Sequence, residues 1–214
     1  MISLFIDTSS YNLIIGIYKD LKEIYLSIEK NDNNLSERIL VNIDKAFKDV
    51  NLNIKQIDNI FVVNGPGSFT GTRIGVTVAK TLAWGLKKPV YRISELEVLA
   101  SKTEEDYIVP MIDARRGYVY AGMYDNKINQ IVEDCYISLD DLYNKVKRHA
   151  KISNVAFVSY DKIDHNKIID IESPIIDIEK IISKHINDKN INPHILNPIY
   201  LKSTEAEEKL GKNV

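Results

Sequence analysis

The first hundred residues alternate between short apolar runs and longer stretches in which apolar positions recur three and four residues apart. Short runs bounded by Asp, Asn, Gly or Pro are typical of strands, and the longer spacing is typical of helices buried on one face. The pattern predicts strands over Ile2–Asp7, Tyr11–Tyr18, Lys22–Glu29, Ile60–Val63 and Pro89–Ile93. It predicts helices over Leu35–Val50, over a stretch ending near Leu86, and from a capping box formed by Ser94 and Glu97.

The same order of elements returns in the second half of the chain. Ile112-Asp113, Gly122 and Tyr124 repeat Ile6-Asp7, Gly16 and Tyr18 at one common offset of 106 positions. A strand over Lys127–Tyr136, a helix over Leu139–His149 and a strand over Val155–Val158 follow. We therefore predict an α/β protein with two lobes, residues 1–103 and 104–214, each a βββαβ unit with a mixed sheet flanked by helices. The second lobe is degenerate, because no glycine lies between Gly122 and Gly211.

One glycine-rich stretch, Asn64–Gly75, joins a predicted strand to a predicted helix. Gly65 and Gly67 permit a close backbone approach, and Ser68 or Thr70 can cap the helix. Small residues spaced by four then form one strip along that helix: Gly71, Gly75, Ala79 and Ala83. Because glycine inside a helix costs about 1 kcal/mol relative to alanine, the strip indicates very close packing. The packing partner is either an element of the same lobe or another molecule, and the residues alone leave both open.

Composition excludes several classes of protein. The 214 residues include 44% hydrophobic and 27% charged residues, and the net charge is −2. This balance gives no electrostatic basis for gripping nucleic acid or an anionic membrane unaided. The single cysteine fits a reducing compartment, and no apolar run approaches the roughly 20 residues of a membrane span. Without a basic segment before Asp7, the N-terminus does not resemble a signal peptide, so we expect a cytoplasmic protein.

Six segments in a fixed order carry a family resemblance. They are IDTS, LSERIL, NGPGSFTGTRIG, SELEVLA, IDARRGYVYAGMY and NPIYLK. The chain resembles the TsaB (YeaZ) family, whose members are non-catalytic partners in bacterial synthesis of threonylcarbamoyladenosine on tRNA. The resemblance implies two actin-like, RNase H-like lobes. Family members often have His where this chain has Asn34 and Leu35, and Arg where it has Lys202, so roles tied to those residues are not carried over.

The resemblance also implies partners. Family members use their two N-terminal helices to dock a TsaD-like catalytic subunit or a second copy of themselves, and a TsaE-like ATPase binds the same assembly. The partner modifies N6 of the adenosine at position 37 in tRNAs that read codons beginning with A. On this implication tRNA is contacted only indirectly, and no membrane is involved. The expected interface residues are Glu37, Ile39, Leu40, Ile43, Gly71, Thr72, Arg73, Gly75, Val78, Ala79 and Leu82.

A nucleotide-dependent transferase or kinase-like enzyme on the same fold is the alternative. Such enzymes hold phosphates with Gly-rich hairpins after the Asp of each first strand, and neither hairpin here is Gly-rich. Candidates for a weak anion or nucleotide contact are Asp7, Thr8, Ser9, Gly67, Ser68 and Asp113. The simpler interpretation is that each Asp caps its own turn through Asx-type hydrogen bonds. We expect no resident cofactor, while weak ATP or magnesium binding, alone or at the partner interface, stays open.

Metal and nucleophile chemistry have little support. The four histidines, His149, His165, His185 and His194, all lie in the second half, and none is spaced by four from another. The HExxH pattern of zinc peptidases is absent, and Cys135 has no neighbouring histidine. We therefore expect surface or loop histidines, no metal and no catalytic residue. A non-catalytic scaffold is the favoured hypothesis, and a peptidase is the least favoured.

Overall fold

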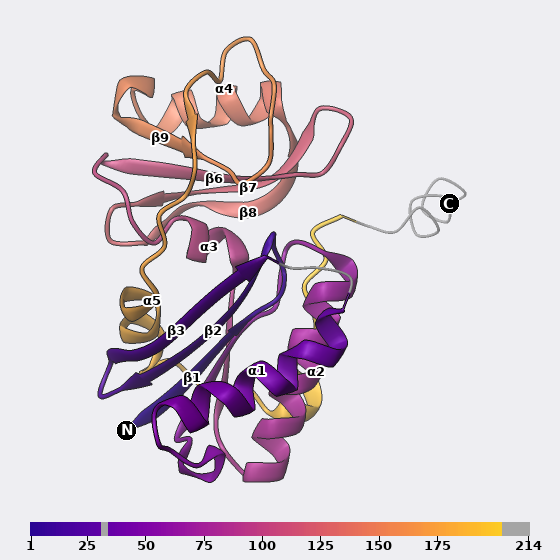
Figure 1. Ribbon diagram of the computed structural model, residues 1–214. Helices are drawn as coiled ribbons and strands as arrows, with labels where there is room; N and C mark the ends of the chain where they lie inside the picture. Colours follow the sequence, from indigo (N-terminus) through magenta and orange to yellow (C-terminus); the bar gives the residue numbers. More distant parts are fainter. Residues whose placement is uncertain (31–33, 203–214) are drawn as a thin grey trace.

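The computed structural model describes residues 1–30 and 34–202 and shows two lobes, each built on a five-stranded sheet (Figure 1). The strands of the first sheet are β1 (Ile2–Asp7), β2 (Asn12–Lys19), β3 (Lys22–Lys30), β4 (Asn59–Val63) and β5 (Val90–Ile93). Their order is β3-β2-β1-β4-β5. The first three strands are antiparallel, and β4 and β5 run parallel to β1.

The second sheet has the same plan. Its strands are β6 (Tyr107–Asp113), β7 (Tyr118–Asp125), β8 (Gln130–Ser138), β9 (Val155–Val158) and β10 (Ile171–Glu172). Read in the same direction, the order β8-β7-β6-β9-β10 repeats the first sheet strand for strand, with the same parallel and antiparallel pairs. The predicted two-lobed α/β fold with duplicated mixed sheets is therefore confirmed.

The repeated Gly-x-Tyr pair has a steric cause. A Cβ atom added to Gly16 would lie 2.6 Å from Cε2 of Tyr18, and one added to Gly122 would lie 3.1 Å from Cε2 of Tyr124. Residues two apart in a strand share one face of the sheet, so each tyrosine ring lies over its glycine. Both tyrosines are buried in the apolar cluster between the lobes. The repeat therefore marks the face of each sheet that is turned toward the other lobe.

The helices divide into outer and inner layers. On the outer face of the first sheet lie α1 (Leu35–Asp49) and α2 (Phe69–Leu86), and on that of the second lies α4 (Leu139–His149) (Figure 1). Two shorter helices, α3 (Glu95–Leu99) and α5 (Ile178–His185), pack in the cluster between the sheets. Single 3₁₀ turns complete the elements: η1 (Ile54–Gln56), η2 (Ile152–Asn154) and η3 (Pro193–Ile195). Residues 159–170, which link β9 to β10, form no helix where the first lobe has α2, as expected for a degenerate second lobe.

The C-terminal part of the chain returns to the first lobe. Ile178, Ile181 and Ile182 of α5 pack in one cluster with Phe5 and Tyr18 of the first sheet. Further along, the backbone N–H of Ile199 donates to the carbonyl of Asn64, and Leu196 is buried in the first lobe's outer core. The division at residue 103 stays a prediction, although α5 and the segment after it pack against the first lobe. None of the described helices is long and apolar enough to cross a membrane.

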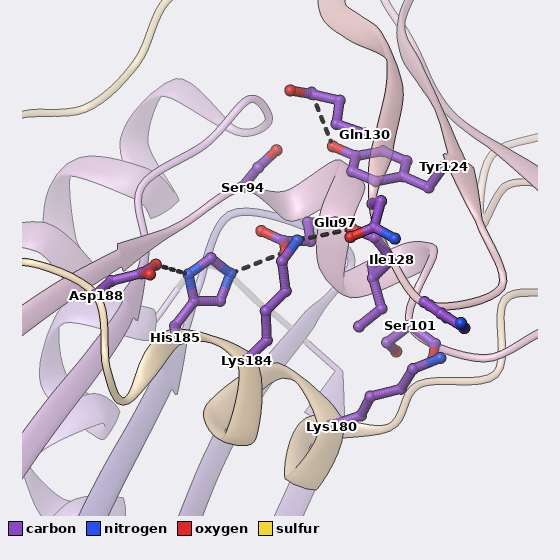
Figure 2. Close-up of polar contacts among 12 residues, drawn as sticks. Ser94, Glu97, Ser101, Tyr124, Ile128, Gln130, Lys180, Lys184, His185 and Asp188 are labelled. Atoms are coloured by element: carbon purple, nitrogen blue, oxygen red, sulfur yellow. Dashed lines mark hydrogen bonds and ion pairs between the residues drawn. The ribbon is translucent and has the colours of Figure 1, made fainter.

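A polar network joins α3 to α5 between the lobes (Figure 2). The buried carboxylate of Glu97 accepts from Lys184 Nζ at 2.6 Å and lies 2.8 Å from His185 Nε2, while His185 Nδ1 lies 2.6 Å from Asp188. Burial opposes the charged imidazolium, but the hydrogen bond and charge of Glu97, followed by Asp188, outweigh it and raise the pKa of His185. The prediction that every histidine lies on the surface or in a loop is wrong here, because His185 is a half-buried helical residue.

The predicted capping box at the start of α3 is also wrong. Ser94 occupies the N-cap position, but its side chain makes no capping hydrogen bond. Its hydroxyl donates instead to Asp134 of β8, which also accepts from Tyr124. The carboxylate of Glu97, the other half of the predicted box, contacts Lys184 and His185 instead. Ser94 therefore connects the lobes and Glu97 connects α3 to α5, so neither side chain is available to cap the helix.

Candidate functional site

The glycine-rich stretch lies directly against the turn between β1 and β2. The backbone N–H of Ser68 donates to the carbonyl of Ser9 at 2.6 Å, and the Thr8 hydroxyl donates to the carbonyl of Gly71 at 2.8 Å. Ser68 also caps α2, since its side chain accepts from the N–H of Gly71. The cap predicted at this position is therefore confirmed.

The small-residue strip of α2 faces inward. A Cβ atom on Gly71 would lie 2.1 Å from the carbonyl oxygen of Thr8, and one on Gly75 would lie 2.2 Å from its Oγ1. Ala79 and Ala83 are buried in the outer core of the same lobe. The alternative of packing within the lobe is thus confirmed, and the prediction that this strip receives another molecule is wrong. The glycines are needed because the β1–β2 turn occupies the space that side chains would fill.

Both first-strand aspartates cap their own turns. Asp7 is buried, and its Oδ1 accepts from the backbone N–H and the hydroxyl of Ser9, at 2.8 and 2.7 Å. Asp113 is exposed, and its Oδ1 accepts from the backbone N–H of Arg115 at 2.9 Å. These are the Asx-type hydrogen bonds of the simpler interpretation, which is confirmed at both positions.

Beneath the β1–β2 turn lies a carboxyl pair that the sequence did not reveal. The Ser9 hydroxyl, which has one proton, lies within hydrogen-bond distance of both Asp7 Oδ1 and Glu95 Oε2, the latter at 3.0 Å. Burial raises the pKa of Glu95, and the negative charge of Asp7 raises it further. Burial also raises the pKa of Asp7, although hydrogen bonds from Glu95 and Ser9 oppose the shift. Of the two carboxyl groups, Glu95 is therefore the one whose pKa lies further above its ordinary value, because burial and the charge of Asp7 act on it in the same direction.

Above this pair a cavity of about 280 Å³ opens between the lobes. Its lining residues are Ser9, Ser10, Tyr11, Gly67, Ser68, Leu99, Met111, Ile112, Asp113, Tyr120, Tyr160 and Asp161. Four of the candidate nucleotide contacts, Ser9, Gly67, Ser68 and Asp113, meet here, whereas Asp7 and Thr8 are buried beneath. No Lys, Arg or His of the described chain lines the cavity. A triphosphate entering it would meet carboxylates and no cation.

The predicted interface residues fall into two groups. Buried inside the first lobe are Ile39, Ile43, Gly71, Thr72, Gly75 and Ala79. These six residues offer a partner little surface because the lobe itself covers them, so their assignment as surface contacts is corrected. Exposed or half-buried are Glu37, Leu40, Arg73, Val78 and Leu82.

Arg73 belongs to an aromatic cluster at the start of α2. Its guanidinium lies 3.7 Å from the centre of the Phe69 ring, and its Nε donates to the Tyr200 hydroxyl at 2.8 Å. The two rings also contact one another, with centroids 5.4 Å apart. The guanidinium thus holds the C-terminal segment on α2 while staying exposed.

Comparison with known proteins places the chain. The family model for TsaD, tRNA N6-adenosine threonylcarbamoyltransferase, matches residues 28–194. The TsaB protein of Bacillus subtilis is 37% identical over 175 residues, which cover 79% of this chain and 76% of that protein. The chain belongs to the TsaB (YeaZ) family.

More distant TsaB relatives agree along the whole length. The TsaB protein of Buchnera aphidicola from Acyrthosiphon pisum is 27% identical over 217 residues, which cover 95% of this chain and 96% of that protein. YeaZ from Pseudomonas aeruginosa superposes with a TM-score of 0.75 at 17% identity, over 94% of this chain and 99% of that one. At that identity the structure supports the shared TsaB fold alone.

Two buried polar contacts of the chain were not predicted from the sequence, those of Glu95 with Ser9 and of His185 with Glu97. Glu95 follows a strand and begins a helix, and an acidic residue in the first turn of a helix is usually exposed, so its sequence position did not indicate burial. His185 ends α5, and the helical spacing of Ile178, Ile181 and Ile182 was the signal in the sequence that could have predicted this helix. Within residues 1–30 and 34–202, no three His, Cys, Asp or Glu side chains come together as a metal site.

Proposed function

We propose that this chain is a non-catalytic subunit that binds and activates a TsaD-like transferase. The transferase places the threonylcarbamoyl group on N6 of the adenosine at position 37 in tRNAs that read codons beginning with A. A TsaE-like ATPase joins the assembly, and other subunits hold most of the tRNA. The proposal places the assembly in the cytoplasm, in keeping with one free cysteine and no disulfide.

The observation that carries this proposal is an apolar patch on the outer side of α1. Leu40 is 56% exposed and Val41 is 64% exposed, although both lie mid-helix in a well-packed lobe. Helix α2 lies beside α1 on the same face of the sheet, and Val78 and Leu82 on it are half-buried (Figure 1). Exposed apolar side chains in the middle of a helix are typical of a surface that a partner covers.

Charged residues border the patch. Glu37 and Asp44 lie one helical turn to either side of Leu40 and Val41 on α1, and both are exposed, as is Arg73 at the start of α2. An apolar centre with a charged rim is the usual anatomy of a protein interface, in which the rim sets specificity more than affinity. Two helices from each partner would then pack as a four-helix arrangement, for either a TsaD-like subunit or a second copy. The patch supports both partners equally.

The interlobe cleft supports a non-catalytic role. Asp7 is buried, accepts hydrogen bonds from Ser9 and is paired with Glu95, so its carboxylate does not line the cavity. The cavity that remains has no cationic side chain among the described residues. A nucleotide-dependent transferase needs both a phosphate site and a reacting group directed at it. The nucleotide-dependent enzyme therefore stays the weaker alternative.

Co-elution with the TsaD-like subunit tests the proposal. The Leu40→Asp/Val41→Asp double variant adds charge to an exposed patch, so we expect an unchanged thermal unfolding midpoint and at least about 30-fold weaker association. Ile169→Asp is the matched control, because Ile169 is 67% exposed in the second lobe. Co-elution retained by the double variant, or lost equally by the control, would remove α1 from the interface.

A further inference from the structure

A second hollow surface flanks α2 near its C-terminal end. Trp84 is 65% exposed and, with Lys87, Lys88 and residues 190–194, lines a groove of about 430 Å³. The groove continues into one of about 630 Å³ that includes Arg92, Lys189 and residues 190–192 and 195–199. We call the two together the Trp84 groove, since Asn190, Ile191 and Asn192 line both.

The Trp84 groove is separate from the α1 patch. Its second wall is η3, which Lys80 holds on α2 by donating from Nζ to the carbonyls of His194 and Leu196, at 3.0 and 3.3 Å. Lys80 and Val78 are two residues apart, so they point to nearly opposite sides of the helix. The segment that forms η3, yellow in Figure 1, runs alongside α2. One helix therefore serves two surfaces.

The walls of the Trp84 groove are fixed by the fold. The N–H of Ile191 donates to the carbonyl of Val90 at 2.9 Å, which joins the segment to the edge of the first sheet. Leu196 is fully buried in the first lobe's outer core. The N–H of His194 donates to the Asn192 side chain at 3.0 Å and begins η3. A groove built this way exists before any ligand arrives, which lowers the entropy cost of binding.

Its charge is opposite to that of the chain. Lys87, Lys88, Arg92, Lys189 and His194 line the groove, and no Asp or Glu among the described residues does. The side chains of Lys87, Arg92 and Lys189 make no hydrogen bond or ion pair with the described part of the chain. Lys88 lies 3.7 Å from Asp58. In a protein of net charge −2, exposed cations without internal partners are available to an external anion.

We propose that the Trp84 groove binds a single-stranded segment of RNA. A base stacks on the indole of Trp84, and Lys87, Arg92 and Lys189 contact phosphates. Aromatic rings combined with a cationic track are the general means of holding unpaired nucleotides. An acidic polypeptide would use the same cations, and the experiments below distinguish it from RNA. This inference goes beyond the proposed partner surface and does not rest on it.

Fluorescence tests the stacking directly, because Trp84 is the only tryptophan in the chain. Titration of the full chain with oligoadenylate should quench its emission saturably. The apparent affinity should fall with salt, with a log–log slope of about −2 for three phosphate contacts. Polyglutamate of equal charge should leave the emission unchanged. Equal quenching by polyglutamate would overturn the proposal in favour of an acidic protein, and no quenching by oligoadenylate would overturn it outright.

Variants separate stacking from charge, with labelled oligoadenylate and fluorescence anisotropy as the readout. We expect Trp84→Ala to bind about tenfold more weakly and Trp84→Phe to retain binding. The triple variant Lys87→Glu/Arg92→Glu/Lys189→Glu should abolish the salt dependence. Its matched control is Lys147→Glu/Arg148→Glu/Lys151→Glu, three exposed cations in the last turn of α4 and directly after it. Equal losses of binding in the two triple variants would show non-specific attraction and overturn the proposal. Co-elution of the Lys87→Glu/Arg92→Glu/Lys189→Glu variant with the TsaD-like subunit should be unaffected.

Discussion

Nε2 of His185 lies 2.8 Å from Oε1 of Glu97 and so joins the two helices that pack between the sheets. Nδ1 of the same ring faces Asp188 at 2.6 Å, so both ring nitrogens meet carboxylate oxygens. Only the imidazolium can donate on both sides, so the contact requires a protonated ring. Since Glu97 belongs to α3 and His185 to α5, the protonation state of one residue affects how firmly the two inner helices are held together (Figure 2).

The first prediction concerns pH. The folded-state pKa of His185 is raised above its ordinary 6.5, so its stabilisation is complete below pH 6.5 and is lost as the pH rises through the raised value. Burial raises the pKa of Glu97, but His185 and Lys184 more than offset this and leave it below 4.5. Its stabilisation is present above pH 4.5 and is lost as the pH falls through the lowered value. The network is therefore strongest between these two limits.

His185→Gln should remove this dependence. We expect it to lower the free energy of urea-induced unfolding by about 1.5–3 kcal/mol near pH 6 and by less near pH 9. His149→Gln, a substitution at an exposed position at the end of α4, is the control and should leave the profile unchanged. If wild type and His185→Gln gave parallel profiles across this range, the charged ring would not contribute.

The second prediction compares two glycines of α2. Gly71→Ala places a methyl group 2.1 Å from a backbone carbonyl, so the turn must shift and the lobe should lose about 1–3 kcal/mol of stability. Gly85→Ala meets nothing within 4 Å and should gain up to about 1 kcal/mol from helix propensity. Thermal unfolding of both variants checks the signs. A Gly71→Ala variant as stable as wild type would contradict the inward packing of the strip.

The third prediction concerns the buried carboxyl pair. Because the folded-state pKa of Glu95 is well above 4.5, its favourable contribution is present below pH 4.5 and is lost as the pH rises through the folded value. Glu95→Gln keeps the shape and a hydrogen-bond donor but cannot ionise. We expect its stability to match wild type at low pH and to exceed it increasingly as the pH rises. Glu105→Gln, at an exposed site, should follow wild type throughout.

The fourth prediction addresses the nucleotide alternative. Since no cation lines the interlobe cavity within the described chain, calorimetry with ATP and magnesium should show no saturable binding below about 1 mM. Asp113→Asn, on the cavity wall, should change nothing. Micromolar binding that is lost in Asp113→Asn would instead favour an active nucleotide-dependent enzyme. Asp7 is unsuitable for this test because it is buried and supports the turn.

Much of the fold followed from local pattern. The strands β1 and β9 and the helix α4 cover the residues predicted for them, because each is a run whose spacing alone distinguishes strand from helix. The Gly-x-Tyr repeat pointed to two equivalent sheets, and its cause is a contact between residues two apart, which sequence can record. By contrast β10 has only two residues, and its pairing with β9 depends on long-range contact.

The candidate site was harder to predict, since its residues are brought together across the chain. Ser9, Ser68 and Asp113 line one cavity only because the two lobes meet there. Glu95 is paired with Asp7 across 88 positions of sequence, and nothing in the local spacing of either residue marks the other. The exposed patch at Leu40 and Val41 likewise depends on which side of α1 the sheet covers.

The sequence by itself determined the two-lobed order of elements, the family, and the fact that something packs very closely on Gly71 and Gly75. Only the tertiary structure decided that this neighbour is Thr8 of the same lobe. The physical reason is that periodicity defines which face of a helix is small or apolar, whereas what covers that face is set by contacts between residues distant in the chain. For the same reason Ile39 and Ile43, which were expected at the interface, lie in the core of the first lobe.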